Sequence, residues 1–377
     1  MKLKKALLVC LIPAFVIGGC GKATTDEAEN TMKQENTAEE SAQDEQETGT
    51  TETEASGKDT NEKTEEASRE LFAMDTYMTL TAYGEHAQEA VDKAAERVEG
   101  LDTLLSTGDD NSEIYQLNQS GKGILSGDGG YLVERALELY KKTDGAFDIA
   151  IYPVMQAWGF PTQEYHVPDK DTLKEKLTLA DASKVNYDKD TRKISFDRDG
   201  MEIDLGGIAK GYTSAQIMQI YQDCGVTSGL VNLGGNVQAL GCKTDGSKWR
   251  VAIQSPDDTE DYLGILEIEN QAVITSGGYE RYFEEDGVTY HHIIDPATGY
   301  PADSGLISVT IVSDDGTLAD GLSTSLFIMG EEKAAQFWRE NSDEFETIME
   351  TADGKLYVTE GIVDSLTTDM DVTVIHK

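Results

Sequence analysis

The chain has 377 residues and carries 71 Asp and Glu residues against 31 Lys and Arg, a formal net charge of −40 at pH 7. So acidic a chain lacks the basic face that nucleic-acid binding requires, and this class of function is excluded. An anionic ligand such as a phosphate would need a cation to neutralise it locally.

The first 19 residues have the pattern of a secretory signal peptide. Three lysines near the N-terminus precede an apolar run over residues 6–17. This run is too short to span a bilayer, which takes roughly 20 residues. Gly18-Gly19-Cys20 follows and resembles the lipobox of bacterial lipoproteins, in which cleavage leaves a lipidated cysteine. The alternative is an ordinary signal peptide followed by an incidental cysteine.

Residues 20–68 are expected to be a disordered acidic tether behind the lipidated Cys20. Residues 21–68 include no Ile, Leu, Val or aromatic side chain. The segment has 15 acidic residues and four lysines. Such a segment cannot bury enough apolar surface to offset its chain entropy. The expected location is the cell membrane, with the folded part anchored by lipid on the extracytoplasmic side.

Residues 69–377 are expected to form one folded domain. Apolar periodicity predicts helices at 86–105, 131–143, 208–223, 318–329 and 331–340. Strands are predicted at 74–83, 201–205, 230–233, 249–254, 263–268, 290–294 and 306–312. A hairpin is predicted over 185–196, and further strands are predicted to begin at residue 273 and to lie near Tyr357. Helices and strands mix without strict βαβ alternation, which favours an α+β fold with a large mixed sheet.

Two cysteines, Cys224 and Cys242, fall within the folded part. Neither has a CxxC partner or the spacing of zinc ligands, so structural zinc is not expected. The two cysteines could form a disulfide or remain as free thiols, and the sequence is compatible with both.

The segment Asp204-Leu-Gly-Gly-Ile-Ala-Lys-Gly211 is predicted to connect a strand to a helix. Gly206 and Gly207 open that helix, where unpaired backbone N–H groups attract phosphate, and Lys210 lies one turn inside. The spacing matches neither GxGxxG nor the Walker pattern. A glycine-rich packing turn with a surface lysine is the alternative.

Asp320 and Thr324 are four residues apart at a predicted helix start and therefore share one face. A carboxylate, a hydroxyl and nearby carbonyls are the oxygen ligands that Mg²⁺ prefers. The alternative is a helix-start charge and a packed threonine. His292 is predicted on a strand before the Asp295–Gly299 turn, where it could act as a general base; beside His291, a structural role is also open.

These segments together resemble the ApbE family of FAD:protein FMN transferases. The resemblance rests on Asp204–Tyr212, Asn232–Asn236, His292–Gly299 and Ala319–Thr324, supported by Met74–Tyr77, Gly145–Asp148 and Trp158–Phe160. The motifs occur in the family's order over roughly residues 70–375. The resemblance implies an ApbE-like fold with FAD bound in a cleft.

By this resemblance, the protein transfers the FMN half of FAD onto a threonine or serine hydroxyl of an acceptor flavoprotein, and AMP is released. Mg²⁺ would be held by Gly207, Asp320, Ser323 and Thr324, with backbone oxygens from Gly207 and Ser323. His292 would be the base, with Asp320 as the alternative. FAD contacts are implied for Met74, Trp158, Gly159, Phe160, Asp204, Lys210 and Ile294.

The acceptors of the family carry the motif Asp-Gly-x-Ser/Thr-Gly-Ala-Thr, which this chain lacks. The chain is therefore expected to be the modifying enzyme, acting on FMN-binding subunits of membrane redox complexes or on extracellular flavin reductases. Two other functions remain open: a Mg²⁺-dependent FAD pyrophosphatase that gives FMN and AMP, and a flavin-binding lipoprotein.

Overall fold

The computed structural model describes residues 65–256 and 261–377. The expected signal peptide (1–19), Cys20 and nearly all of the expected tether lie outside the described residues. Strand β1 begins at Glu66, ahead of the expected domain start at residue 69. None of the helices in the described ranges is long and apolar enough to cross a membrane.

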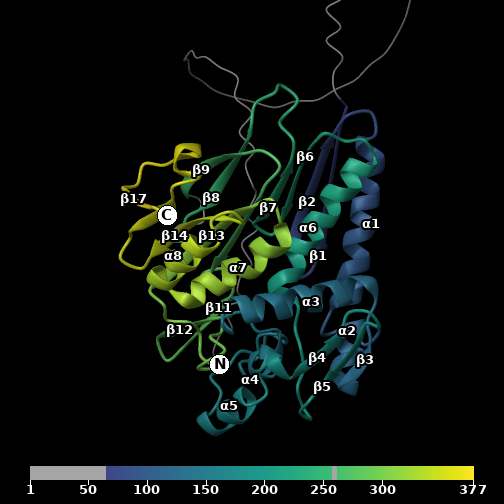
Figure 1. Ribbon diagram of the computed structural model, residues 1–377, viewed down its shortest axis with the longest axis vertical. Coiled ribbons are helices and arrows are strands. Elements are labelled where there is room, and N and C mark those ends of the chain that lie inside the picture. Colours follow the sequence, from purple (N-terminus) through teal and green to yellow (C-terminus); the bar gives the residue numbers. More distant parts are fainter. Residues whose placement is uncertain (1–64, 257–260) are drawn as a thin grey trace, which may run out of the picture. The chain divides into compact units, whose positions relative to one another are not determined.

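A nine-stranded mixed sheet is the centre of the fold (Figure 1). Its neighbouring strands are antiparallel except for β15 and β17, which run parallel. The expected α+β class with a large mixed sheet is confirmed. In order across the sheet, the strands are β1 (Glu66–Ala73), β2 (Thr76–Tyr83), β6 (Ser228–Leu233), β7 (Asn236–Leu240), β10 (Ala272–Gly277), β13 (Leu306–Ser313), β14 (Glu346–Thr351), β15 (Leu356–Thr359) and β17 (Val372–Ile375).

Helices cover one face of this sheet, and a second sheet covers part of the other. In β10, Ala272 and Ile274 enter the helix-side core, whereas Val273 enters the core shared with the second sheet. Side chains alternate along a strand, so a strand buried on both faces is apolar throughout. The covering elements are α1 (Ala87–Leu105), α6 (Gly206–Asp223), α7 (Gly316–Met329) and α8 (Glu331–Glu340), and the second sheet of β16 (Leu366–Thr367), β9 (Tyr262–Ile268) and β8 (Trp249–Gln254).

The remaining elements lie mainly in the long connection between β2 and β6. They are α2 (Glu113–Ser120), α3 (Gly127–Lys142), α4 (Tyr152–Ala157), α5 (Lys170–Leu177) and the small sheet of β3 (Lys122–Ile124), β5 (Lys193–Phe196) and β4 (Val185–Asp188). The hairpin of β11 (Tyr282–Glu285) and β12 (Val288–His291) forms a separate two-stranded sheet. Short 3-10 turns occur at Ile149–Ile151, Ala182–Lys184 and Val363–Ser365.

The predicted strand at 201–205 is wrong. Its alternating apolar side chains are buried, but the segment pairs with no strand. Instead, the Asn118 side chain takes the place of a neighbouring strand, because its Nδ2 donates to the Ile203 carbonyl and its Oδ1 accepts from the Ile203 N–H, both at 2.8 Å. The predicted strand over 290–294 ends at His291, so His292 lies just beyond it. Cys224 and Cys242 are free thiols.

Candidate active site

The turn between β1 and β2 brings Met74 to the start of helix α6. Met74 and Asp75 have φ of 49° and 59°, as a two-residue hairpin turn of this type requires. The Met74 N–H donates to Asp102 Oδ1 at 2.9 Å, and Thr213 Oγ1 donates to Met74 Sδ at 3.7 Å. The turn is therefore held against α1 and α6 from both sides.

Helix α6 begins at Gly206, as the glycine pair predicts. The Asp204 carboxylate already accepts a hydrogen bond from a backbone N–H at this helix start. The Gly206 N–H donates to Asp204 Oδ1 at 2.9 Å, and the Asp204 N–H donates to the Ile149 carbonyl at 2.8 Å. Burial raises the pKa of Asp204, and the charge of Arg281 opposes that rise. The Gly206 N–H is thus not free for a phosphate, and Asp204 fixes the geometry of the turn.

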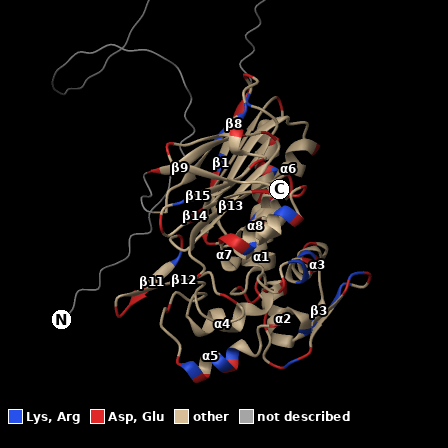
Figure 2. Cartoon of the chain, turned by 60° about the vertical axis from the view of Figure 1, so that its left-hand side comes forward, with Lys and Arg blue, Asp and Glu red and all other residues tan. Residues whose placement is uncertain are grey.

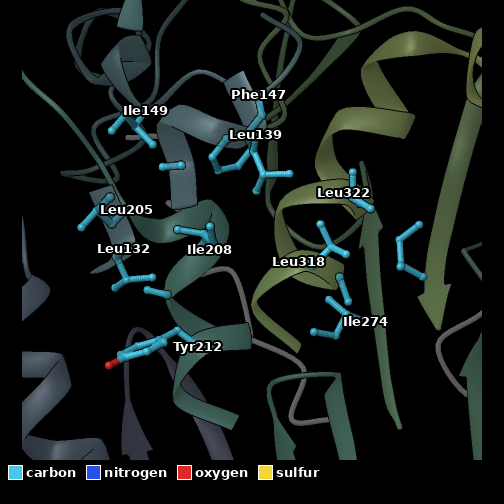
Figure 3. Packing of buried hydrophobic residues seen from close by; sticks show 14 of the residues in the cluster. Leu132, Leu139, Phe147, Ile149, Leu205, Ile208, Tyr212, Ile274, Leu318 and Leu322 are labelled. Atoms are coloured by element: carbon cyan, nitrogen blue, oxygen red, sulfur yellow. The ribbon is translucent and has the colours of Figure 1, made fainter. Parts of the chain in front are cut away.

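Helices α6 and α7 cross in very close contact. A Cβ added at Gly211 would overlap the Gly316 carbonyl oxygen and the Asp320 Cβ. Figure 3 shows the apolar side chains around this crossing, among them Ile208 of α6 and Leu318 and Leu322 of α7. Because glycine lacks a Cβ, the two backbones can approach closely enough for α6 to hydrogen-bond a side chain of α7.

Asp320 is the buried carboxylate at this crossing, with 5% of the residue exposed. Its Oδ2 accepts from the Gly211 N–H at 2.8 Å, and its Oδ1 accepts from Asn236 Nδ2 at 3.1 Å. Burial raises the pKa of Asp320, whereas the positive charge of Lys210 opposes the rise. Asp320 lies inside α7 rather than at its start, because the helix begins at Gly316 behind an Asp315 cap.

Three hydroxyl groups gather beside Asp320. Ser276 Oγ, at the end of β10, lies 2.7 Å from Ser323 Oγ and 3.3 Å from Thr324 Oγ1. Ser323 Oγ also donates to the Asp320 carbonyl at 2.8 Å. The end of one strand and one face of α7 therefore present oxygen atoms only.

The predicted ligand set fits Mg²⁺ chemically. It consists of the Asp320 carboxylate, the Thr324 hydroxyl and backbone carbonyls, and Mg²⁺ binds oxygen through one or two carboxylates. The Gly211 N–H, one helical turn beyond Gly207, donates to Asp320 Oδ2 and so ties the first turns of α6 to this carboxylate. In the described ranges, no three His, Cys, Asp or Glu side chains form a metal cluster, as expected for a site with one carboxylate.

The two adjacent histidines have different surroundings. His291 Nε2 lies 3.1 Å from the Ala302 carbonyl and its Nδ1 accepts from the Ile293 N–H at 3.2 Å, so both ring nitrogens are engaged. His292 Nδ1 lies 3.2 Å from the Arg281 carbonyl, an acceptor, so Nδ1 carries the hydrogen and Nε2 keeps its lone pair. Burial, together with Arg281 and Lys210, lowers the pKa of His292 to about 3. His292 is thus a neutral imidazole at pH 7.

Charged side chains surround this imidazole. Lys210 acts electrostatically on His292, Asp320 and Glu280. Crowding by protein atoms raises the pKa of Glu280 to about 7, although its side chain keeps contact with solvent. Arg281 pairs with Asp75 at 3.6 Å, which links the β11–β12 hairpin to the β1–β2 turn.

The Trp158–Phe160 segment belongs to a separate aromatic cluster beneath the β11–β12 hairpin. The side chains of Trp158 and Phe160 are fully buried, and Trp158 Nε1 donates to the Gly299 carbonyl at 2.8 Å. Gly159 has φ of 76°, and a Cβ there would overlap the Glu164 carbonyl. Ile294 is buried in the same cluster. Neither Trp158 nor Phe160 exposes any surface, so both support the hairpin from beneath.

Hydrogen bonds and electrostatic interactions link most of the predicted site residues. Asp320, Ser323, Thr324, Lys210 and His292 form one centre, and Asp204 and Met74 border it across the α6 start. Sequence reasoning missed Ser276, Glu280 and Arg281, which lie just before and within the loop that follows β10. The sequence pattern that could have indicated these residues is a predicted strand that ends in Ser-Gly-Gly and is followed by charged residues. A pocket of about 910 Å³ lies beside β3–β5 and contains none of these residues.

A buried carboxylate beside hydroxyls, a lysine and a neutral histidine is an arrangement that suits reaction of a phosphate-containing substrate. The sequence profile of the ApbE family matches residues 74–349, so the chain belongs to the ApbE family. It is 36% identical over 296 residues to the FAD:protein FMN transferase of Treponema pallidum, a match that covers 73% of this chain and 82% of that one.

Solved structures agree with this assignment. The ApbE protein of Thermotoga maritima superposes with a TM-score of 0.75 at 29% identity, covering 79% of this chain and 98% of that one. The flavin transferase ApbE of Vibrio cholerae superposes with a TM-score of 0.71 at 28% identity, covering the same shares of the two chains.

Proposed function

We propose that this protein is a Mg²⁺-dependent FAD:protein FMN transferase. It transfers the FMN moiety of FAD to a threonine or serine hydroxyl of an acceptor flavoprotein and releases AMP. Membership of the ApbE family and similarity to named FAD:protein FMN transferases support the reaction. The new bond joins the acceptor oxygen to the FMN phosphorus, and the bond from that phosphorus to the oxygen of AMP breaks.

The single observation that carries the mechanism is the orientation of His292. The Arg281 carbonyl holds the Nδ1–H, so the neutral ring offers Nε2 as a proton acceptor. In transfer to a hydroxyl, Nε2 takes the hydroxyl proton as the oxygen attacks phosphorus. The lowered pKa of His292 in the free protein reflects burial first and then the charges of Arg281 and Lys210, and the negative charge of a bound substrate would oppose the effect of these cations.

Lys210 is proposed to bind the pyrophosphate, and the electrostatic effect of its charge on His292 and Asp320 supports this role. Asp320, Thr324 and the Gly207 and Ser323 carbonyls would hold Mg²⁺, which when bound stabilises charge on the phosphates. Met74, Trp158, Gly159, Phe160, Asp204 and Ile294 are proposed to contact FAD, as the resemblance to the family implies. The positive charges of Lys210 and of a bound Mg²⁺ would offset the strongly acidic composition of the chain at the site where the anionic pyrophosphate binds.

The acceptor is proposed to be a flavoprotein that carries the motif Asp-Gly-x-Ser/Thr-Gly-Ala-Thr. To test the function, residues 21–377 are incubated with FAD, Mg²⁺ and a small acceptor protein with this motif, and intact mass is measured under denaturing conditions. A start at residue 69 would remove part of β1. A covalent FMN adduct that needs Mg²⁺ and the acceptor threonine supports the transferase. Free FMN and AMP without an adduct would indicate a pyrophosphatase, and unchanged FAD a binding protein.

We also propose that residues 1–19 are removed as a signal peptide and that Cys20 is lipidated, so that the enzyme is anchored on the extracytoplasmic side of the cell membrane. The small residues before Cys20 and the acidic segment after it support this. The full chain expressed in a bacterium should partition into detergent, whereas Cys20→Ser should remain in the aqueous phase. Equal partitioning of the two would contradict lipidation.

A further inference from the structure

Strand β7 carries two buried amide side chains on the face that the helices cover. Asn236 is 2% exposed and Gln238 is 5% exposed. The two residues are two positions apart and therefore share one face of the strand, whereas Val237 and Ala239 enter the core shared with the second sheet. Burying an amide is unfavourable unless it is hydrogen-bonded. Both amides have such partners at the crossing of α6 and α7.

The two amides hold different helices of this crossing. Gln238 Oε1 accepts from Ser214 Oγ of α6 at 2.6 Å. Asn236 Nδ2 donates to Asp320 Oδ1 of α7 at 3.1 Å. Strand β7 thus contacts each helix through one amide, and the amide that reaches the proposed metal ligand is that of Asn236.

Asp320 lies in a part of the fold that holds few charges. It is the only charged residue of α7, and strands β6, β7, β10 and β13 contain no Lys, Arg, Asp or Glu. Figure 2 shows the same distribution, with red and blue mainly on loops and outer helices and with tan strands at the centre of the sheet. The direction in which the Asp320 carboxylate points therefore depends on the hydrogen bonds that it accepts.

These hydrogen bonds engage both carboxylate oxygens of Asp320. Oδ2 accepts from the Gly211 N–H at 2.8 Å, and Oδ1 accepts from Asn236 Nδ2. Each oxygen has two lone pairs and so keeps one for a cation. Rotation of the carboxylate out of this orientation would break both hydrogen bonds. Because an ionised carboxylate only accepts, Asn236 must present its NH₂ group to Asp320.

The turn before β7 fixes the position of Asn236. Leu233 and Asn236 pair across a two-residue turn in which Gly234 and Gly235 have φ of 65° and 95°. The Gly235 N–H donates to Asn232 Oδ1 at 2.8 Å. In the segment Asn232–Asn236, the first asparagine thus shapes the turn and the last one reaches Asp320.

We propose that Asn236 is the positioning residue of the proposed Mg²⁺ ligand Asp320. The proposal rests on the proposed function and adds to it a residue that determines the affinity of the metal site. A hydrogen-bond partner of a metal ligand orients that ligand before the metal binds, and its loss typically weakens metal affinity about 10–100-fold. Asn236 acts only through Asp320, so it controls how much Mg²⁺ is needed and leaves the chemical step unchanged once Mg²⁺ saturates.

The test compares Asn236→Leu with Gln238→Met in residues 21–377. Asn236→Leu removes the donor and keeps a branched side chain of similar size. Gln238→Met is the matched control, because it removes a hydrogen bond from the same face of the same strand without touching Asp320. Melting temperature is measured at fixed FAD and increasing Mg²⁺, and the rate of FMN transfer is measured over the same Mg²⁺ series.

For Asn236→Leu, the Mg²⁺ concentration that gives half of the melting-temperature gain should rise about 10–100-fold. The Mg²⁺ concentration for half-maximal transfer should rise equally, with kcat at saturating Mg²⁺ close to that of the parent. Gln238→Met should lower the melting temperature without Mg²⁺ and keep the parent's Mg²⁺ requirement. Asn236→Ala, which removes the donor without adding bulk, should show the same rise and keeps the test valid if Asn236→Leu does not fold.

The possible failures give different results. If the parent neither gains melting temperature from Mg²⁺ with FAD nor transfers FMN, the proposed function fails and this inference fails with it. If the parent responds and the Asn236 variants need no more Mg²⁺ than the parent, only the inference is overturned. An equal rise in the Mg²⁺ requirement of Gln238→Met would also overturn it, because the effect would then belong to the helix crossing as a whole.

Discussion

Gly211 of α6 and Gly316 of α7 lie in backbone contact, and this contact places the Gly211 N–H on the Asp320 carboxylate. Neither helix could carry a side chain at the crossing without moving the other. The position of the proposed metal ligand is therefore determined by two residues that have no chemistry of their own.

Gly211→Ala should lower both stability and activity. The added Cβ would overlap the Gly316 carbonyl, and overpacking of a close contact costs about 1–3 kcal/mol. Gly100→Ala in α1 is the matched control, because a Cβ there meets nothing within 4 Å and should stabilise the helix by about 0.5–1 kcal/mol. Chemical denaturation of both variants measures this, and a Gly211→Ala variant as stable as the parent would contradict the close contact.

Comparison of His292→Asn with His291→Asn should distinguish the catalytic histidine from the structural one. Loss of the base at His292 should reduce transfer about 10²–10⁴-fold with little change in melting temperature. His291 has both ring nitrogens engaged, so His291→Asn should cost about 1–3 kcal/mol of stability and reduce transfer much less. Turnover at saturating FAD and thermal melting are the two measurements, and the reverse pattern would place the base at His291.

Asp320→Asn should abolish the response to Mg²⁺. The parent should gain melting temperature when Mg²⁺ and FAD are added together, since a ligand that binds only the folded state stabilises it. Asp320→Asn keeps the shape of the side chain but removes its charge, so this gain and the transfer activity should both disappear. Thr324→Ser keeps the hydroxyl and serves as the control, with most of the gain retained. A full Mg²⁺ response in Asp320→Asn would exclude Asp320 as a ligand.

Asp148 should make stability depend on pH. Its Oδ1 accepts from the Ala150 N–H at 2.7 Å and its Oδ2 from the Ala182 N–H at 3.1 Å, yet burial raises its pKa to about 6. The folded state therefore binds the proton more tightly than the unfolded state, and stability is lost as pH rises from about 4 to about 6.

The test compares Asp148→Asn with the parent across this range. The difference in free energy of unfolding should move in favour of the variant by about 2 kcal/mol between pH 4 and pH 7. Asp199→Asn, at an exposed position, should show a much smaller change with pH. A constant difference for Asp148→Asn would mean that the Asp148 carboxyl keeps an ordinary pKa in the fold.

Local patterns predicted the regular elements well and the centre only in part. Strand β8 and helix α8 have the predicted bounds, because alternation and helical spacing are properties of neighbouring residues. The segment 201–205 alternates equally well but pairs with the Asn118 side chain, a contact that periodicity does not encode. Ser276 and Arg281 escaped notice for the same reason, since their partners are Ser323 and Asp75, far away in sequence.

The central sheet also has a consequence for how the molecule becomes active. Met78 of β2 pairs with Leu233 of β6, although the whole connection from α1 through α6 lies between them. Contacts this distant in sequence form late and slowly, because a long loop must close first. Asp75 precedes this connection, Lys210 lies within it, and His292 and Asp320 follow it. A newly made chain should thus acquire flavin affinity in a single late step, and flavin binding should report that folding is complete.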